Sequence, residues 1–292
     1  MKIVKSVFFV GILFLLASCL KDEYQAKILD NETEIQNYIT SKNLTVQKSA
    51  EGMYYQITSG GQTAKAQVGD LIEYYNKLTL LSGGVIDSSL TSKGQVRSLI
   101  YGGFNASIYN LPLSYLNVGD KGLFLLPSAL AYGGSSTDAY AAYSCFRVDL
   151  QVVKILTQAQ LMERMKVENN MVDAKTTTSG MMYKKLKENP TGKKVEFGYS
   201  GKFTYTGKFG FNYNHRDASG TLVYNQIFDA GSVNFSFNSG SFIKGFEEAL
   251  QLMNEGEKIQ IILPYTLAYG EAGNSSIPGY CPLYFELEVT AQ

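Results

Sequence analysis

The sequence of 292 residues contains no tryptophan, one histidine and only three cysteines. The single histidine, His215, stands in a polar run, where a solvated loop residue is expected, and no cysteine pair has the spacing of zinc ligands. The glycine pairs Gly83-Gly84 and Gly102-Gly103 lack the Lys-Ser/Thr that completes a phosphate-binding loop. The sequence therefore predicts no metal site and no cofactor.

An excess of charge of either sign is also lacking. The chain has 26 basic and 26 acidic residues. Nucleic-acid binding relies on a basic surface, so no nucleic-acid partner is expected. The sequence leaves the oligomeric state open.

Long hydrophobic runs are confined to the start of the chain. Lys2 and Lys5 precede an apolar run that is too short for a membrane-spanning helix and is typical of a secretory signal. The run ends in Leu16-Ala-Ser-Cys19, which resembles the bacterial lipobox, whose cysteine is acylated and becomes the first mature residue. We therefore expect a signal peptide over residues 1–18, a lipid anchor to the membrane on Cys19, and a tether over residues 19–30.

The residue after Cys19 is Leu20 rather than Asp, which by resemblance to other lipoproteins indicates the outer membrane of the cell envelope. An ordinary secretory signal with an unmodified cysteine is the alternative. Cys145 and Cys281 could pair with each other, but they belong to different repeats. We expect two buried free thiols, because isolated cysteine behaves as a small hydrophobic residue.

The chain repeats itself. A set of residues recurs at one constant offset, in the order Gly119, Lys121, Pro127, Leu130 to Gly133, and again Gly256, Lys258, Pro264, Leu267 to Gly270. Phe146–Leu150 is also matched to Phe285–Val289. The sequence therefore predicts two tandem domains, over residues 31–156 and 157–292. The second copy carries extra residues around Asn212 to Asn225, which we interpret as a longer hairpin over the pocket.

Helix signals mark the start of each copy. Asn31 with Glu34 predicts a capping box, and Thr157 with Gln160 predicts another. A third helix is expected where Phe246, Ala249, Leu250 and Met253 form one apolar stripe, with Gly256 placed to end it.

The second copy resembles the FKBP-type peptidyl-prolyl isomerases. The resemblance rests on motifs that follow one another in the family's order: Phe203-Thr-Tyr-Thr-Gly207, Ile227-Phe-Asp229, Phe242-Ile243, Gly245-Phe-Glu247, Met253, Gly256, Leu267 to Gly270, Ile277-Pro278 and Leu283 to Phe285. It implies an α+β fold with two FKBP-like domains, each an antiparallel curved β-sheet wrapped on one short helix.

The resemblance also implies a site. Tyr269 would donate its hydroxyl to the substrate carbonyl, the backbone N–H of Ile243 would hold the next carbonyl, and Asp229 would bond Tyr205. The proline pocket would be lined by Tyr205 and Ile243 together with Phe228, Phe235, Phe242, Phe246, Ile277 and Phe285. Phe246 stands where the family commonly has tryptophan, which predicts a slack pocket floor.

The first copy departs from the pattern. Asp87 is kept, but Asn76 stands at the position of the pocket tyrosine, although a shift of one residue would place Tyr75 there instead. Alternation favours Asn76. Pro112 should break or shift the helix, and no Ile-Pro loop follows Gly134. Tyr132 and Phe146 are expected to remain in a weak or inactive site.

These patterns predict an enzyme, a peptidyl-prolyl cis-trans isomerase that acts on exported, proline-containing polypeptides through its second domain. The alternative is a non-catalytic peptide-binding or envelope-assembly lipoprotein, such as a chaperone or a component of motility machinery.

Overall fold

The computed structural model describes residues 26–89, 95–104, 107–216, 222–237 and 240–290, without the side chains of 213–216 and 222–225. Residues 1–25, with Cys19 and the predicted signal peptide, lie outside the described residues, as do residues 105–106 and residues 217–221 of the predicted longer hairpin. Within the described part, no helix is long and apolar enough to cross a membrane.

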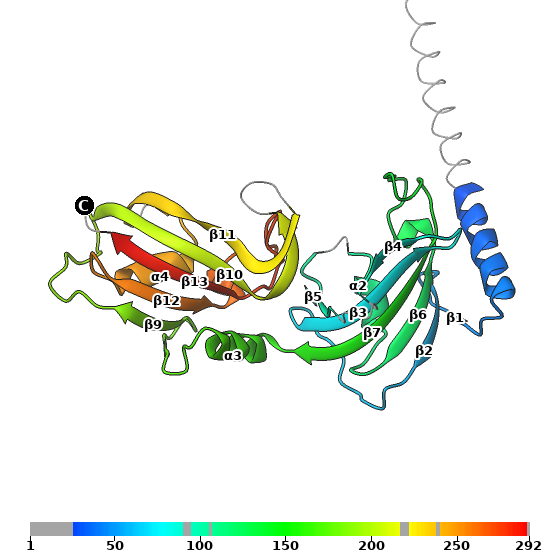
Figure 1. The fold of residues 1–292 in the computed structure, drawn as a ribbon, viewed down its shortest axis with the longest axis horizontal. Helices are drawn as coiled ribbons and strands as arrows, with labels where there is room; N and C mark the ends of the chain where they lie inside the picture. Colours follow the sequence, from blue (N-terminus) through cyan, green and yellow to red (C-terminus); the bar gives the residue numbers. More distant parts are fainter. Residues whose placement is uncertain (1–25, 90–94, 105–106, 217–221, 238–239, 291–292) are drawn as a thin grey trace, which may run out of the picture. The chain divides into compact units, whose positions relative to one another are not determined.

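The described chain contains two antiparallel sheets (Figure 1). The first has the strand order β1-β2-β6-β7-β3-β4, and β5 pairs with β3. Its strands are β1 (Gln47–Lys48), β2 (Tyr54–Thr58), β3 (Leu71–Leu80), β4 (Val85–Ser88), β5 (Arg97–Ile100), β6 (Lys121–Leu126) and β7 (Phe146–Leu156).

The second sheet has the order β11-β10-β13-β12-β9-β8. Its strands are β8 (Lys175–Thr176), β9 (Met182–Lys187), β10 (Ser200–Arg216), β11 (Leu222–Ser236), β12 (Lys258–Leu263) and β13 (Leu283–Thr290). With one short helix against each sheet, α2 (Asn110–Ser114) and α4 (Lys244–Gln251), this confirms the predicted α+β class.

The chain divides into two compact units. The first comprises residues 1–62, 75–95 and 111–151, and the second comprises 63–74, 96–110 and 152–292. The sheets follow the repeat, since all strands of the first lie before residue 157 and all strands of the second lie after it. The linear domain boundaries stay a prediction.

The first helix covers residues 26–41 and therefore includes the end of the predicted tether. The capping box predicted at Asn31 is wrong, because Asn31 lies inside this helix. Its amide instead joins the helix to a loop: Nδ2 donates to the carbonyl of Tyr143 at 2.9 Å, and Oδ1 accepts from the N–H of Ser128 at 2.8 Å. A capping sequence is read locally, whereas these two bonds depend on the tertiary fold.

The second capping box is confirmed. Thr157 caps α3 (Gln158–Glu168): its Oγ1 accepts from the N–H of Gln160, and the Gln160 side chain accepts from the N–H of Thr157. Leu161 and Met165 are fully buried on one face of α3.

The other two helices differ from their predicted lengths. Pro112 lies within α2, which has only five residues. Helix α4 ends at Gln251, before Met253 and Gly256, although Met253 is fully buried. Gly256 instead has a φ of 81° and donates its N–H to the carbonyl of Val289, so it forms the turn into β12.

Strand pairing defines how the two copies correspond. Lys121 faces Gln151 and Leu126 faces Phe146 in the first sheet, while Lys258 faces Glu288 and Leu263 faces Leu283 in the second. Phe146 therefore occupies the position of Leu283, and Val148 occupies that of Phe285. The predicted match of Phe146 to Phe285 is wrong, because alternating apolar strands look alike when shifted by two residues.

The loop before these strands is also shared. Thr137 donates its N–H to the carbonyl of Tyr140 at 2.9 Å, as Asn274 does to that of Ile277 at the same distance. Tyr140 follows Tyr132 at the spacing at which Ile277 follows Tyr269. The first copy thus keeps the loop that we expected to be missing, with Tyr140 in place of the isoleucine.

The extra residues of the second copy extend the β10–β11 hairpin, whose register shifts after Gly207 and again before Tyr213. At the base of this extension Phe209 and Phe211 are buried, and a Cβ on Gly210 would meet Met165 of α3 at 2.6 Å. The base therefore packs against α3. The expectation that the hairpin covers the pocket stays a prediction.

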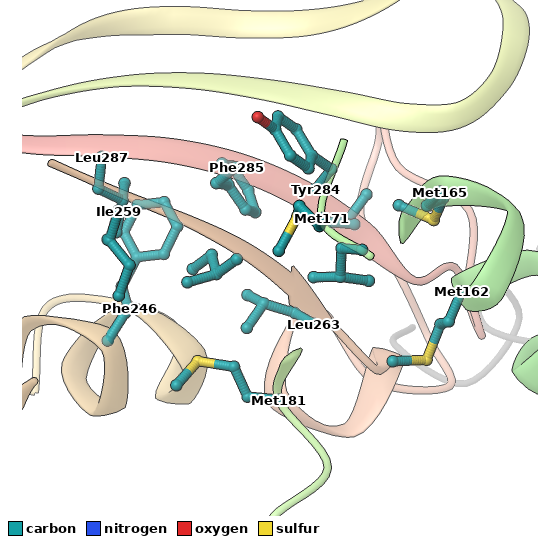
Figure 2. Packing of buried hydrophobic residues seen from close by; sticks show 14 of the residues in the cluster. Met162, Met165, Met171, Met181, Phe246, Ile259, Leu263, Tyr284, Phe285 and Leu287 are labelled. Carbon is teal, nitrogen blue, oxygen red and sulfur yellow. The ribbon is translucent and has the colours of Figure 1, made fainter. Parts of the chain in front are cut away.

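The core of the second unit joins α3, α4 and the sheet. Figure 2 shows Phe246 extending from α4 toward β12 and β13, with Met162 and Met165 of α3 at the other end of the cluster. Cys145 and Cys281 are free and buried, as predicted, and burial raises the pKa of both thiols.

A buried carboxylate ties β12 to the preceding loops. Glu257 is 2% exposed and accepts from Lys185 Nζ at 2.8 Å and from the N–H groups of Asn189 and Asn254 at 3.0 and 2.8 Å. Burial opposes its ionisation, but these donors outweigh burial, so the pKa of Glu257 lies below its usual value of 4.5.

Glu257→Gln should destabilise the second unit by about 2–3 kcal/mol at neutral pH, because charge-assisted hydrogen bonds are lost. A lowered pKa gives stability that is present above the unfolded value and lost as pH falls through the folded one. Urea unfolding followed by circular dichroism at about pH 7 and about pH 3.5 should therefore show a smaller difference between wild type and variant in acid. An equal difference at both values would contradict this.

Candidate functional site

Strand β10 presents three motif residues on one face. Phe203, Tyr205 and Gly207 alternate along the strand and so point to the same side of the sheet. A Cβ on Gly207 would lie 2.6 Å from the rings of both Phe228 and Phe285. Glycine is therefore required at this position, because the two rings meet against the strand backbone.

Those two rings are part of a larger aromatic cluster. Phe285 packs edge-to-face on Phe228, at 5.6 Å between ring centroids, and on Phe246, at 4.6 Å. Phe246 also lies 6.2 Å from the ring of Tyr205. These interplanar angles are the ones that aromatic quadrupoles favour. Strands β10, β11 and β13 and helix α4 thus bring four of the predicted site residues together.

A second glycine sets the height of α4. A Cβ on Gly245 would lie 2.4 Å from the side chain of Leu263, so only glycine lets the helix approach β12 this closely. The next residue, Phe246, is 7% exposed. The position commonly held by tryptophan is therefore filled by a buried phenylalanine.

Tyr205 and Asp229 form the polar part of the site. The Tyr205 hydroxyl donates to Asp229 Oδ2 at 2.7 Å, which is the bond that the family resemblance implies. Burial, then this hydrogen bond and the nearby charge, raise the pKa of Tyr205 to about 12. A carboxylate is thus held at the edge of an apolar cluster by one oriented hydroxyl.

Tyr269 lies next to this pair and is 37% exposed. Burial first, and then the negative charge of Asp229, raise its pKa above the usual value of 10.0. Among the described residues, no group forms a hydrogen bond with the Tyr269 hydroxyl. This hydroxyl is therefore a protonated donor that can serve a ligand.

Ile243 is the N-cap of α4, with φ −60° and ψ 149°. Its carbonyl accepts from the N–H of Phe246, but within the described part of the chain its own N–H has no acceptor. The first N–H groups of a helix lack intrahelical partners. The N–H of Ile243 can therefore bind a carbonyl from a ligand.

The Ile277 loop is fixed by one side chain. Asn274 Oδ1 accepts from the N–H of Ile277 at 2.8 Å, and the Asn274 N–H donates to the Ile277 carbonyl at 2.9 Å. Ile277 is 3% exposed and belongs to the same apolar cluster as Phe246 and Phe285.

The remaining predicted rings, Phe235 and Phe242, pack on Phe203, and Phe242 also lies 6.5 Å from the ring of Phe246. The Phe203 ring lies 5.2 Å from Phe235, 5.4 Å from Phe242 and 5.9 Å from Phe246. Within the described residues, the Phe235 ring packs on Tyr199, Phe203 and Phe242 but not on Phe246 or Phe285, and Phe235 is buried. Phe203 was missed as a site residue, although its spacing from Tyr205 and Gly207 could have revealed it.

The corresponding place in the first unit is built differently. Asn76 Nδ2 donates to Asp87 Oδ2 at 2.8 Å, which supports Asn76 over Tyr75 as the counterpart of Tyr205. Tyr140 stacks on Tyr132 at 4.8 Å, and Phe146 packs edge-to-face on both, at 5.3 and 5.4 Å. Three rings thus pack on one another where the second unit has Tyr269, Ile277 and Leu283.

Comparison with known proteins finds relatives of the second unit. Residues 187–290 match the family model of FKBP-type peptidyl-prolyl cis-trans isomerases. A probable FKBP-type isomerase of Haemophilus influenzae is 35% identical over 121 residues, which is 40% of this chain and 44% of that protein. These matches support the FKBP-type peptidyl-prolyl isomerase family for the second unit.

Longer but weaker matches extend over both units. The isomerase FKBP9 of mouse is 25% identical over 226 residues, 77% of this chain and 35% of its own length. The chain therefore spans about a third of the length of the first curated relatives that it matches. Among solved structures, the three FKBP domains of wheat FKBP73 align with 85% of this chain and 98% of theirs, at 17% identity and a TM-score of 0.37. A score this low carries no argument.

The Tyr205–Asp229 bond can be measured in a double-mutant cycle of Tyr205→Phe and Asp229→Asn. We expect a coupling of about 1.5–3 kcal/mol in urea unfolding, because the acceptor is charged and the pair is partly buried. Tyr183→Phe, a partly buried tyrosine of β9, serves as the control and should be additive with Asp229→Asn. Additivity of the Tyr205 pair would show that the bond contributes nothing.

Proposed function

We propose that the second unit catalyses cis-trans isomerisation of Xaa-Pro bonds. The observation that carries the proposal is the meeting of an aromatic cluster with two donors that lack partners among the described residues, the Tyr269 hydroxyl and the Ile243 N–H. The family match to residues 187–290 supports it.

The chemistry needs neither a nucleophile nor a metal. Rotation about the bond removes amide resonance, at a barrier of about 18–20 kcal/mol. The twisted amide has less charge separation than the planar one, so an apolar cradle around Phe246 and Phe285 favours it. Only interactions that strengthen in the twisted state raise the rate.

The two donors would hold the peptide on either side of the rotating bond. Tyr269 would donate to the carbonyl of the residue before proline, and the N–H of Ile243 would bind a carbonyl further along. Asp229 would act as a positioning residue through Tyr205, whose ring borders Phe246. These roles extend the family resemblance to this chain residue by residue.

We further propose that the clients are exported polypeptides and that the protein is anchored by a lipid on Cys19 at the outer membrane. Support comes from the basic start, the short apolar run and the Leu-Ala-Ser-Cys sequence. Two or more acyl chains would hold the protein stably, whereas one binds marginally.

A second candidate function is a non-catalytic peptide-binding or assembly role. The observation that favours it is the first unit, where Tyr140 stacks on Tyr132 and Val148 replaces a ring. We propose that this unit does not isomerise proline and that catalysis is confined to the second.

Proline isomerisation of a tetrapeptide set should be accelerated by the full chain well above the thermal rate. Tyr269→Phe should lower kcat/KM about twofold to tenfold, the equivalent of one hydrogen bond, and Asp229→Ala should also lower it. The matched control is Tyr132→Phe, the same change at the equivalent position of the first unit, which should leave the rate unchanged. A folded chain without acceleration on any peptide would sink the catalytic proposal in favour of the binding role.

The same assay has an expected pH profile. The raised pKa values keep Tyr205 and Tyr269 protonated throughout neutral and mildly alkaline solution. The catalysed rate should therefore be flat between about pH 6 and about pH 9. A decline with a midpoint below pH 9 that disappears in Tyr269→Phe would contradict donation from a tyrosine with a raised pKa.

A further inference from the structure

The outward face of the first sheet contains a groove of about 630 Å³, which is within the size range of ligand sites. The groove is separate from the aromatic site of either unit. Strands β2, β3, β6 and β7 form its floor, and Tyr38 of the first helix lies at one wall. Its lining is mostly polar: Tyr38, Gln56, Thr58, Lys77, Lys121 and Arg147, with Asp149 and Gln151.

The groove carries an excess of positive charge. Three cations, Lys77, Lys121 and Arg147, face one carboxylate, Asp149. Both oxygens of that carboxylate are already bound, since Arg147 Nε donates to Oδ2 at 2.8 Å and Nη2 donates to Oδ1 at 2.7 Å. Within the described residues, neither Lys77 nor Lys121 has an ion-pair partner. Two lysines are thus available to a ligand.

The second sheet supplies an internal comparison. Lys258 is the counterpart of Lys121, and it binds Glu286 at 2.6 Å. The residue opposite Lys258 is Glu288, whereas the residue opposite Lys121 is the neutral Gln151. In the second sheet, the counterpart of Lys121 is therefore paired with a carboxylate. The first sheet has lost one carboxylate and gained Arg147 where the second has Tyr284.

The spacing of Lys77 and Lys121 suits a ligand with two separate anionic groups. Lys121 is on β6 and Lys77 is on β3, with β7 between them. Strands lie about 4.8 Å apart, so the two backbones are roughly 10 Å apart, which leaves room for one carboxylate at each lysine. An extended peptide places every second side chain on one side at about 7 Å, which flexible lysine and glutamate side chains can match.

We propose that this groove binds an acidic segment of a polypeptide in an extended conformation. Two carboxylates pair with Lys77 and Lys121. The hydroxyls of Thr58 and Thr79 and the amides of Gln56 and Gln151 hydrogen-bond the peptide. This gives the first unit a binding role that needs no proline pocket, and it does not depend on catalysis by the second unit.

The test measures the fluorescence anisotropy of a labelled Ala-Glu repeat peptide with the full chain, and with the Ala-Gln peptide for comparison. We expect the acidic peptide to bind and the Ala-Gln peptide not to bind. The binding should be weaker at about 0.5 M than at about 0.05 M salt. Lys77→Ala with Lys121→Ala should weaken it about tenfold. Lys154→Ala with Lys202→Ala removes the same charge from exposed positions elsewhere and should have little effect.

A second variant leaves Lys77 and Lys121 in place and changes only the charge beside Lys121. Gln151→Glu places a carboxylate opposite Lys121, as in the second sheet, and should also weaken binding, whereas Gln251→Glu at the exposed end of α4 should not. The proposal is overturned if the wild type does not bind the acidic peptide, or if Gln151→Glu binds it as tightly as the wild type. It is equally overturned if inorganic phosphate or vesicles of anionic phospholipid displace the peptide with the same dependence on Lys77 and Lys121.

Discussion

The close approach of two rings to the backbone at Gly207 is the constraint on which the site depends. Phe228 of β11 and Phe285 of β13 meet there from the two strands that flank β10. Because a side chain at this position would separate them, the glycine fixes the depth of the aromatic floor. Phe246 then packs on Phe285 from α4, and Gly245 lets that helix come close enough to do so.

The polar groups of the site follow from this packing. Tyr205 precedes Gly207 by two residues, so its ring lies on the same face and its hydroxyl reaches Asp229, which directly follows Phe228. Burial first, and then the charge of Asp229, raise the pKa of Tyr269. One apolar contact therefore sets the positions of a carboxylate and two hydroxyls. Such a combination places hydrogen-bonding groups at the edge of an apolar surface without providing a nucleophile.

Much of the candidate site could be predicted from the sequence, because its residues belong to motifs that resemble those of the family. The alternation of β10 is a local pattern, and Gly207 and Gly245 are found through the family motifs to which they belong. The errors have a tertiary origin. Asn31 bonds a distant loop rather than a helix end, and the register of β7 against β6 shows that Phe146 was aligned two residues away from its true counterpart. Phe203 was passed over because a buried ring in a strand looks like ordinary core.

The two copies differ both at the aromatic site and on the outer face of the sheet. In the first, Tyr140 replaces Ile277 in a loop of the same geometry, and its ring stacks on Tyr132, whose counterpart Tyr269 stays exposed. Because the Tyr140 ring stacks on Tyr132, less of the Tyr132 ring is left for a ligand to contact. On the opposite face of the same sheet, Arg147 stands in place of Tyr284 and binds Asp149, the counterpart of the Glu286 that pairs with Lys258. Within the described residues, Lys121 is therefore left without an ion-pair partner. Substitutions that close the inner site of the first copy are thus accompanied by one that opens its outer face.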